Sequence, residues 1–365
     1  MTNENLKMNI ISEYVKKNLK TFDNLAFNEI DALVFSWISY YRLPKAMYKN
    51  KSSSIQLKDL YNRKYFDDLL FDIFDTEKSR ELLSYIAASP RFRDIEMLYY
   101  VQKTSKKVEK QFSAMAFKIN KKELVIAFRG TDHSFVGWKE DLNMSFMKNI
   151  PSQIEAKKYL DKVMENTKGS VYVVGHSKGG NLSVYASCFL KKEYRHRVLK
   201  VYNFDGPNLN KDLISTIEYK RIKSKINKFV PQSSVVGMCF DKTSDYKIIK
   251  SNAIGVLQHS PFSWEIENNK LKVLKDTTFD SKMFKNGINA LINDLSEDEL
   301  RVFADTIYSV IEETNTDTVE ELMANLGKNM KIILGASMNL DESQKKVLSK
   351  VSEIFFKESF KISKS

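Results

Sequence analysis

Short apolar runs and amphipathic stretches alternate through the middle of the chain. The runs with strand character are rich in β-branched and aromatic residues and cover residues 112–119, 123–128, 170–174, 197–204, 226–230 and 246–256, the last as one or two strands. The charged residues 120–122 between the first two runs fit a hairpin turn. Helical spacing at 152–166 and 180–190 separates the later strands. Buried strands that alternate with helices predict a mainly parallel sheet with helices on both faces.

Both ends of the chain show the apolar spacing of helices. Before the sheet begins, residues 27–41, 77–87 and 94–101 follow this pattern. After residue 280 the apolar positions that share a face are Leu300, Phe303, Ile307, Val310 and Ile311 on one helix, and Val347, Leu348, Val351, Ile354 and Phe355 on another. We therefore expect an α/β domain over residues 1–280, with a helical N-terminal part at 1–105, and a helical appendage at 281–365.

The composition is that of a globular chain, with 365 residues of which 42% are hydrophobic and 28% charged. No apolar run approaches the 18 residues that a membrane span requires. The first 21 residues are polar and lysine-rich and lack a signal-peptide pattern. Cys188 and Cys239 have no metal-ligand spacing and are interpreted as buried thiols in a reducing compartment. We expect a cytoplasmic protein.

The net charge of +12 raises the question of a nucleic-acid partner. Residues 281–365 hold 11 Lys and Arg and 14 Asp and Glu, so the rest of the chain carries +15. This excess is dispersed as short pairs such as Lys16-Lys17, without a helix-turn-helix, zinc-finger or aromatic RNA-binding signature. We expect no nucleic-acid partner, whereas weak association with an anionic membrane surface is compatible with the charge.

The strongest local motif is Gly175-His-Ser-Lys-Gly179, which follows an apolar strand and precedes a helix. A serine on such a tight strand-to-helix turn sits in strained backbone geometry, and glycines two residues before and after it make room for the bend. The helix N-terminus that follows favours developing negative charge. The motif predicts a nucleophile elbow with Ser177 as the nucleophile.

A serine nucleophile requires a base, and the chain has four histidines. His176 adjoins Ser177, so its ring is expected to point away and to pack, while His196 lies in a basic, surface-type run. His133 lies beside the loop that follows an earlier strand. His259 follows the last strand-like segment, C-terminal to the other candidates as the order Ser, acid, His requires, and is the predicted base.

The acid has three candidates. Asp205 ends the strand after the nucleophile helix, and Gly206-Pro207 then forces a turn that exposes its carboxylate at the edge where α/β sheets place their sites. Asp241 and Asp245 precede the segment at 246 and are alternatives. Asp205 is the first choice, and a simple turn-forming role for it stays open.

Two backbone donors are expected to face the oxyanion. The amide of Lys178 follows the nucleophile, and the second donor should come from the loop after residues 124–128, where Gly130 admits close approach of the substrate. Thr131 offers an amide and a hydroxyl, and Asp141 could orient that hydroxyl.

These motifs together resemble the class 3 (fungal-type) triacylglycerol lipases. That family has Phe-Arg-Gly-Ser/Thr at its oxyanion strand, a Trp and an Asp shortly after, and Gly-His-Ser-x-Gly-Gly at its elbow. The matching segments here are Phe128-Arg-Gly-Thr131, Trp138, Asp141 and Gly175-His-Ser-Lys-Gly-Gly180, with Asn203-Phe-Asp-Gly-Pro207 similar to its Phe-Gly-x-Pro segment.

The chain resembles more closely a bacterial family of lipase-like proteins without an assigned function. The segments that carry this resemblance are Gln111-Phe-Ser-Ala114, Gly137-Trp-Lys-Glu-Asp141, Val230-Pro-Gln-Ser-Ser234 and Gln258-His259 with Pro261-Phe-Ser-Trp264. The resemblance covers about residues 25–265 and implies an α/β-hydrolase fold with a mostly parallel sheet. One departure concerns the acid, because Lys228 stands where class 3 lipases usually carry it, which again directs attention to Asp205.

We therefore expect a serine hydrolase that cleaves a carboxylic ester of a small molecule or lipid through Ser177, His259 and Asp205. Thr131 and Lys178 would bind the oxyanion, with Asp141, Gly130, Gly175 and Gly179 in supporting positions. A covalent acyl-enzyme requires no cofactor and no metal. Thioester or peptide hydrolysis and acyl transfer on the same residues, a catalytically idle binding scaffold, and a basic surface module are the alternatives.

Overall fold

The computed structural model describes residues 10–48, 55–132, 134–240, 245–316 and 326–362. Its centre is a nine-stranded sheet with the order β1-β2-β3-β4-β5-β6-β7-β8-β11. The strands are β1 (Ile55–Gln56), β2 (Glu96–Ser105), β3 (Lys110–Lys118), β4 (Glu123–Phe128), β5 (Ser170–His176), β6 (Val198–Phe204), β7 (Ile226–Pro231), β8 (Lys247–Ile249) and β11 (Val273–Leu274). Strands β4 to β8 pair in parallel, and the pairs on either side of them are antiparallel. The predicted parallel core and the hairpin of β3 and β4 are confirmed.

The helices are α1 (Ile11–Lys17), α2 (Glu29–Ile38), α3 (Lys45–Tyr48), α4 (Phe66–Leu69), α5 (Thr76–Ala88), α6 (Phe135–Asn143), α7 (Pro151–Asn166), α8 (Lys178–Cys188), α9 (Lys211–Ile214), α10 (Ile217–Ile222), α11 (Phe279–Asp294), α12 (Glu297–Glu312), α14 (Leu326–Met338) and α15 (Glu342–Ile362). A separate small hairpin pairs β9 (Ile266–Glu267) with β10 (Lys270–Leu271). In the described part of the chain, no helix is both long and apolar enough to cross a membrane.

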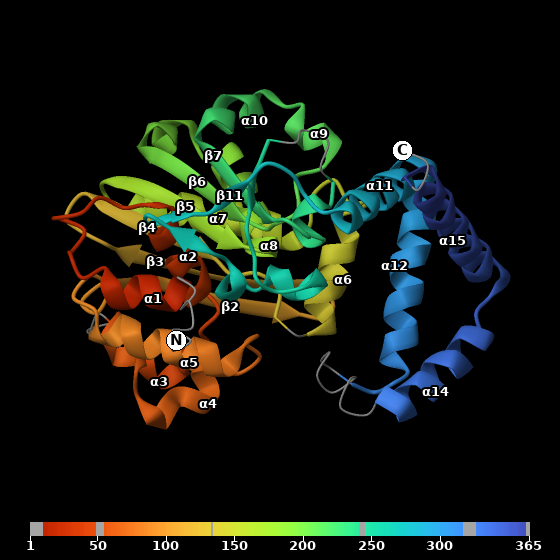
Figure 1. Ribbon diagram of the computed structural model, residues 1–365, viewed down its shortest axis with the longest axis horizontal. Helices are drawn as coiled ribbons and strands as arrows, with labels where there is room; N and C mark the ends of the chain where they lie inside the picture. Colours follow the sequence, from red (N-terminus) through yellow and green to blue (C-terminus); the bar gives the residue numbers. More distant parts are fainter. Residues whose placement is uncertain (1–9, 49–54, 133, 241–244, 317–325, 363–365) are drawn as a thin grey trace, which may run out of the picture.

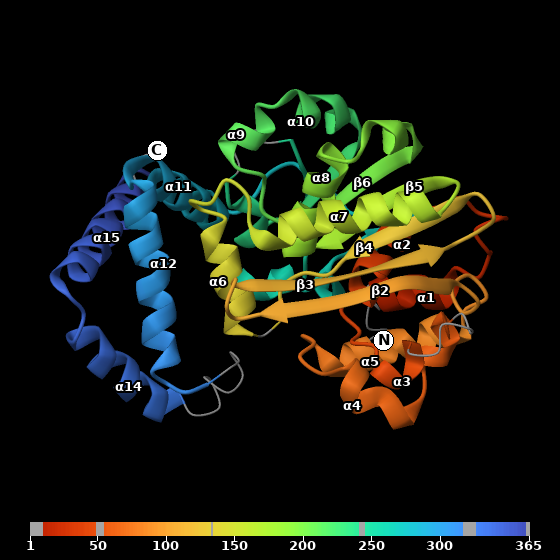
Figure 2. The ribbon, with the colours of Figure 1, turned by 180° about the vertical axis from the view of Figure 1, so that it is seen from behind.

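The two faces of the sheet are covered by different parts of the chain (Figures 1 and 2). Because side chains alternate along a strand, Val125 and Ala127 of β4 join the cluster of α1, α2 and α5, whereas Leu124 and Ile126 join that of α7 and α8. Both sides of the central strands are therefore apolar, which explains why these strands read as continuous hydrophobic runs. Helix α2 begins at an Asn28 capping box, as its sequence indicates.

One predicted helix is wrong. Residues 94–101, assigned to the helical N-terminal part, lie mostly in strand β2, which pairs with β3 and carries a bulge between Leu98 and Val101. Tyr99 in this bulge has a φ of 53°. The extra residue shifts the two-residue alternation, so the apolar positions Met97, Leu98 and Val101 imitate the spacing of a helix.

The C-terminal helices approach the sheet through α6 and the loop after β7. Lys139 of α6 forms an ion pair with Asp305 of α12 at 3.1 Å, and Phe146 packs in the apolar cluster of α11, α12 and α15. Ser281 of α11 donates a hydrogen bond to the Ser234 carbonyl at 2.7 Å. The division into a domain at 1–280 and an appendage at 281–365 stays a prediction.

Candidate active site

Ser177 occupies a strained turn between β5 and α8. Its φ of 57° and ψ of −136° are a backbone conformation that side-chain-bearing residues rarely adopt, at a cost of about 1–3 kcal/mol. A Cβ on Gly175 would come within 2.1 Å of the Gly179 carbonyl oxygen, and one on Gly179 within 2.1 Å of the Phe128 oxygen. The predicted elbow geometry and its dependence on both glycines are therefore present in the fold.

Asp205 lies at the end of the neighbouring strand β6 and is 1% exposed. Its Oδ2 atom is 2.6 Å from Nδ1 of His259. Its Oδ1 atom accepts hydrogen bonds from the Ser234 hydroxyl at 2.5 Å and from the Gly237 amide at 3.1 Å. With these three donor atoms around it, the carboxylate is fixed in place and holds the imidazole in one orientation.

The Asp205 contact determines the tautomer of His259. An ionised carboxylate only accepts hydrogen bonds, so Nδ1 of His259 carries the proton, and in the neutral ring Nε2 keeps a free electron pair. The ring centroid of His259 lies 4.5 Å from that of His176, the residue before Ser177. The structure thus brings the predicted base and acid together beside the elbow.

His176 holds the loop of His259, a role that the sequence did not suggest. Its Nε2 lies 2.8 Å from the His259 carbonyl oxygen, and its Nδ1 lies 2.9 Å from the Tyr40 hydroxyl. Because a carbonyl only accepts, Nε2 must donate and Nδ1 must accept from Tyr40. Burial, followed by the proximity of His259, lowers the pKa of His176 well below its usual value, so this ring stays neutral.

Gly130 and Thr131 lie beside the elbow, at the end of β4. A Cβ on Gly130 would come within 3.0 Å of the Ser177 Cβ and would collide with the Tyr40 hydroxyl. The Thr131 hydroxyl donates to Asp141 Oδ2 at 2.5 Å. When Asp141 is ionised, this hydroxyl is committed to the carboxylate, so the Thr131 amide is the donor that it leaves for an oxyanion.

Asp141 has a raised pKa of about 6. Burial is the largest cause, and the Lys178 ammonium and the Thr131 hydroxyl act in the opposite direction, while Glu140 adds to the rise. Oδ1 of Asp141 has no hydrogen-bond partner among the described residues and lies 3.9 Å from Nζ of Lys178.

The side chain of Lys178 forms a buried link that the sequence analysis did not anticipate. Its Nζ donates to Gln111 Oε1 at 2.7 Å and to Glu140 Oε2 at 3.0 Å, and both charged side chains are fully buried. Glu140 also accepts from the Gln111 amide at 3.0 Å and the Ser152 amide at 2.9 Å. The residue after the nucleophile is therefore tied to β3, α6 and α7 at once.

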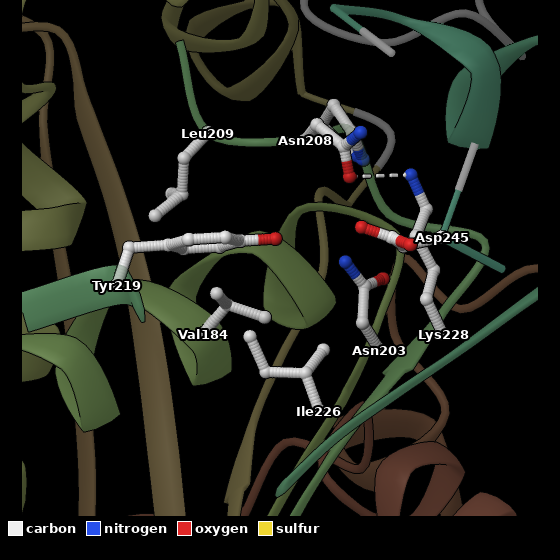
Figure 3. Close-up of a pocket in the computed structure, with 9 residues that line it drawn as sticks. Val184, Asn203, Asn208, Leu209, Tyr219, Ile226, Lys228 and Asp245 are labelled. Carbon is white, nitrogen blue, oxygen red and sulfur yellow. Dashed lines mark hydrogen bonds between the residues drawn. The ribbon is translucent and has the colours of Figure 1, made fainter. Parts of the chain in front are cut away.

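The alternative acids have other surroundings. Asp245 forms an ion pair with Lys223 at 2.8 Å and lies beside Lys228 and Asn203 in a small cavity (Figure 3). Asp241 lies outside the described residues. Lys228, at the position of the class 3 acid, donates to Asn208 Oδ1 and to the Gly237 carbonyl, each at 2.7 Å. Since the Gly237 amide bonds to Asp205, Lys228 supports the turn around Asp205.

Of the two remaining histidines, the structure describes His196 alone. His196 is exposed in the short helical turn Lys192–Arg197, and His133 lies outside the described residues. In the part of the chain that the structure describes, no three His, Cys, Asp or Glu side chains gather as a metal-ion site would require.

Two comparisons with known proteins find similarity. The model of the Mbeg1-like family matches residues 86–309, which is more than half of the chain. Among solved structures, the crystal structure of M37 lipase matches with a TM-score of 0.37 and 18% sequence identity, over 58% of this chain and 70% of that one. No curated protein matches the chain. The mostly parallel central sheet with helices on both faces confirms the predicted α/β-hydrolase type of fold, and the family match shows that the chain belongs to the Mbeg1-like family.

Proposed function

We propose that the protein is a serine hydrolase that cleaves a carboxylic ester of a small molecule or lipid. The observation that carries this proposal is the contact of 2.6 Å between His259 Nδ1 and Asp205 Oδ2, formed beside the strained turn of Ser177. Such a pair leaves Nε2 of His259 as the base, and the elbow presents a serine hydroxyl at the edge of the sheet.

In the proposed reaction, the Ser177 oxygen attacks the ester carbonyl carbon while Nε2 of His259 takes the hydroxyl proton. The imidazolium is stabilised by Asp205, and the amides of Lys178 and Thr131 donate to the oxyanion. Collapse of the tetrahedral intermediate breaks the bond to the leaving alcohol, which receives the proton from His259. Water, deprotonated by His259, then attacks the acyl-enzyme and releases the carboxylic acid and free Ser177.

The neutral state of His176 suits this cycle. His259 becomes cationic in each half of the reaction, and a second cation 4.5 Å away between ring centroids would oppose that charge. Because His176 resists protonation, it supports the loop of His259 without adding this repulsion.

A fluorophosphonate probe tests the proposal. We expect a mass increase on the peptide that carries Ser177, no labelling of this peptide in Ser177→Ala, and strongly reduced labelling in His259→Ala. His196→Ala is the matched control and should label as the wild type does, since His196 is exposed and lies before β6, whose first residue pairs with the start of β5 and not with the end that carries the elbow. A folded wild-type protein that neither labels nor hydrolyses p-nitrophenyl butyrate would contradict the proposal and favour a binding scaffold.

A further inference from the structure

An apolar groove lies beside the candidate active site. It has a volume of about 520 Å³ and runs between the loop after β7, the segment 253–258 and the start of α11. This volume falls within the range of about 300–1,000 Å³ that is usual for small-molecule sites. The apolar side chains that line it are Val235, Ala253, Ile254, Met283 and Phe284.

The groove borders the loop that leads to His259 and the loop after β7 that supports Asp205. Gln258, in its wall, immediately precedes His259. Ser233, also in the wall, precedes Ser234, whose hydroxyl donates to Asp205. Two residues of the groove wall are therefore direct sequence neighbours of His259 and of Ser234, the residue that supports Asp205.

Three polar side chains of the groove, those of Ser233, Thr278 and Gln258, are already bonded within the protein. The hydroxyls of Ser233 and Thr278 pair at 2.9 Å. Gln258 accepts from the Ser233 amide at 2.9 Å and donates to the Ala253 carbonyl at 3.0 Å. Because their hydrogen bonds are satisfied internally, these groups give a ligand little polar recognition, and apolar contact has to supply the binding free energy.

Charge and exposure narrow the class of ligand further. Asp280 is the acidic residue of the lining, so an anionic head group would meet a like charge there. Ile254 is 85% exposed and Leu257, three residues on, is 70% exposed. These two aliphatic side chains lie in water beside an apolar groove. An aliphatic chain that covers them removes their apolar surface from water, which lowers the free energy of the complex.

We propose that this groove binds the uncharged aliphatic chain of the substrate. The assignment rests on the proposed function for its link to the reaction, and it specifies the substrate class as an ester with a hydrophobic chain and no anionic group next to that chain. Helix α11, from the C-terminal helices, then forms one wall of the chain site.

Ester chain length tests this proposal. Ile254→Asp should lower kcat/KM for p-nitrophenyl octanoate about tenfold or more, while the acetate ester, whose chain is too short to use the groove, keeps its rate. Ile217→Asp is the matched control, because Ile217 is 61% exposed on α10 and outside the groove. Met283→Trp fills the groove and should reduce octanoate turnover more than butyrate turnover. Parallel losses for all chain lengths, or wild-type profiles in both groove variants, would overturn the proposal.

Direct binding separates the groove from the reaction. Ser177→Ala, which cannot form an acyl-enzyme, should bind 1-decanol by calorimetry, and Ser177→Ala with Ile254→Asp should bind it at least tenfold more weakly. Decanol binding of this kind in a protein without esterase activity would sustain the groove and refute the proposed function. Active wild-type enzyme whose Ser177→Ala variant binds no decanol would refute the groove alone.

Discussion

The side chain of His176 holds the backbone of His259. Its Nε2 donates to the His259 carbonyl oxygen at 2.8 Å, and the Tyr40 hydroxyl donates to its Nδ1 at 2.9 Å. The residue before the candidate nucleophile thus fixes the loop of the candidate base, and Tyr40, which follows α2, fixes the tautomer that makes this possible. Three segments far apart in the sequence meet in this chain of hydrogen bonds.

Replacing His176 by Phe keeps a ring of similar size but removes both hydrogen bonds. The His259 carbonyl loses its donor in a mostly buried place, a loss that typically costs about 1–3 kcal/mol. If the position of the His259 loop that supports catalysis loses this free energy, the rate of fluorophosphonate labelling of Ser177 should fall about tenfold to a hundredfold. The KM for a short ester should change little. His196→Phe is the control, and a His176→Phe enzyme as fast as this control would show that the contact does not position His259.

The neutral state of His176 has a consequence for stability. Its pKa in the folded protein lies well below the ordinary 6.5, so below about pH 6.5 the unfolded chain binds a proton that the folded chain does not. This group should therefore lower the free energy of unfolding as the pH falls, by up to about 1.4 kcal/mol per pH unit. Urea unfolding from pH 7.5 to 5.0 should show a steeper loss for the wild type than for His176→Phe. Identical slopes would mean that His176 is protonated in the folded state.

Asp205 and Asp245 are distinguished by their partners. Asp205→Asn keeps the shape of the side chain but removes the charge that fixes the His259 tautomer, and in an established serine triad such a change lowers kcat about 10⁴-fold. We expect a loss of about 10³–10⁴-fold here, measured with p-nitrophenyl butyrate. Asp245→Asn removes an ion pair with Lys223 in which both side chains are about half exposed, and kcat should stay within about twofold. The reverse pattern in folded proteins would place the acid at Asp245.

Local sequence was sufficient for the elbow, because Gly175 and Gly179 are required by contacts within and just beside one turn. The strands of the parallel core could also be predicted from local sequence, since both faces of each strand are buried and its sequence is therefore a continuous apolar run. The order of the candidate residues along the chain then pointed to His259 and Asp205, and the fold places these two side chains in contact.

Most of the features that the sequence analysis did not predict depend on contacts between segments that are distant in the sequence. Tyr40 has no motif around it, and its contact with His176 joins residues 136 positions apart. The sequence analysis assigned a role to the amide of Lys178 but none to its side chain, which pairs in the interior with Glu140, 38 positions away. The bulge in β2 was hidden for a different reason, because one extra residue changes the apolar period without any special residue type at Tyr99.

The buried pair of Lys178 and Glu140 should matter more to stability than any pair on the surface. Lys178→Met leaves the Glu140 carboxylate buried without its cation, and breaking such a pair typically costs about 3–5 kcal/mol of unfolding free energy. Lys178→Met with Glu140→Gln removes both charges and should recover part of this loss, because no unpaired charge stays behind. Lys58→Met, which removes the exposed pair with Asp94, should cost less than about 1 kcal/mol.

Urea unfolding at pH 7.5 measures all three variants. Lys178 also donates hydrogen bonds to Gln111 of β3 and Glu140 of α6 and so connects both to the elbow. The folded double variant should therefore label Ser177 more slowly than the wild type. If Lys178→Met costs no more than Lys58→Met, the carboxylate of Glu140 must take up a proton or reach water when its partner is removed. In that case the hydrogen bonds of Glu140 to the Gln111 and Ser152 amides hold α6 against β3 and α7, and the lysine adds little stability.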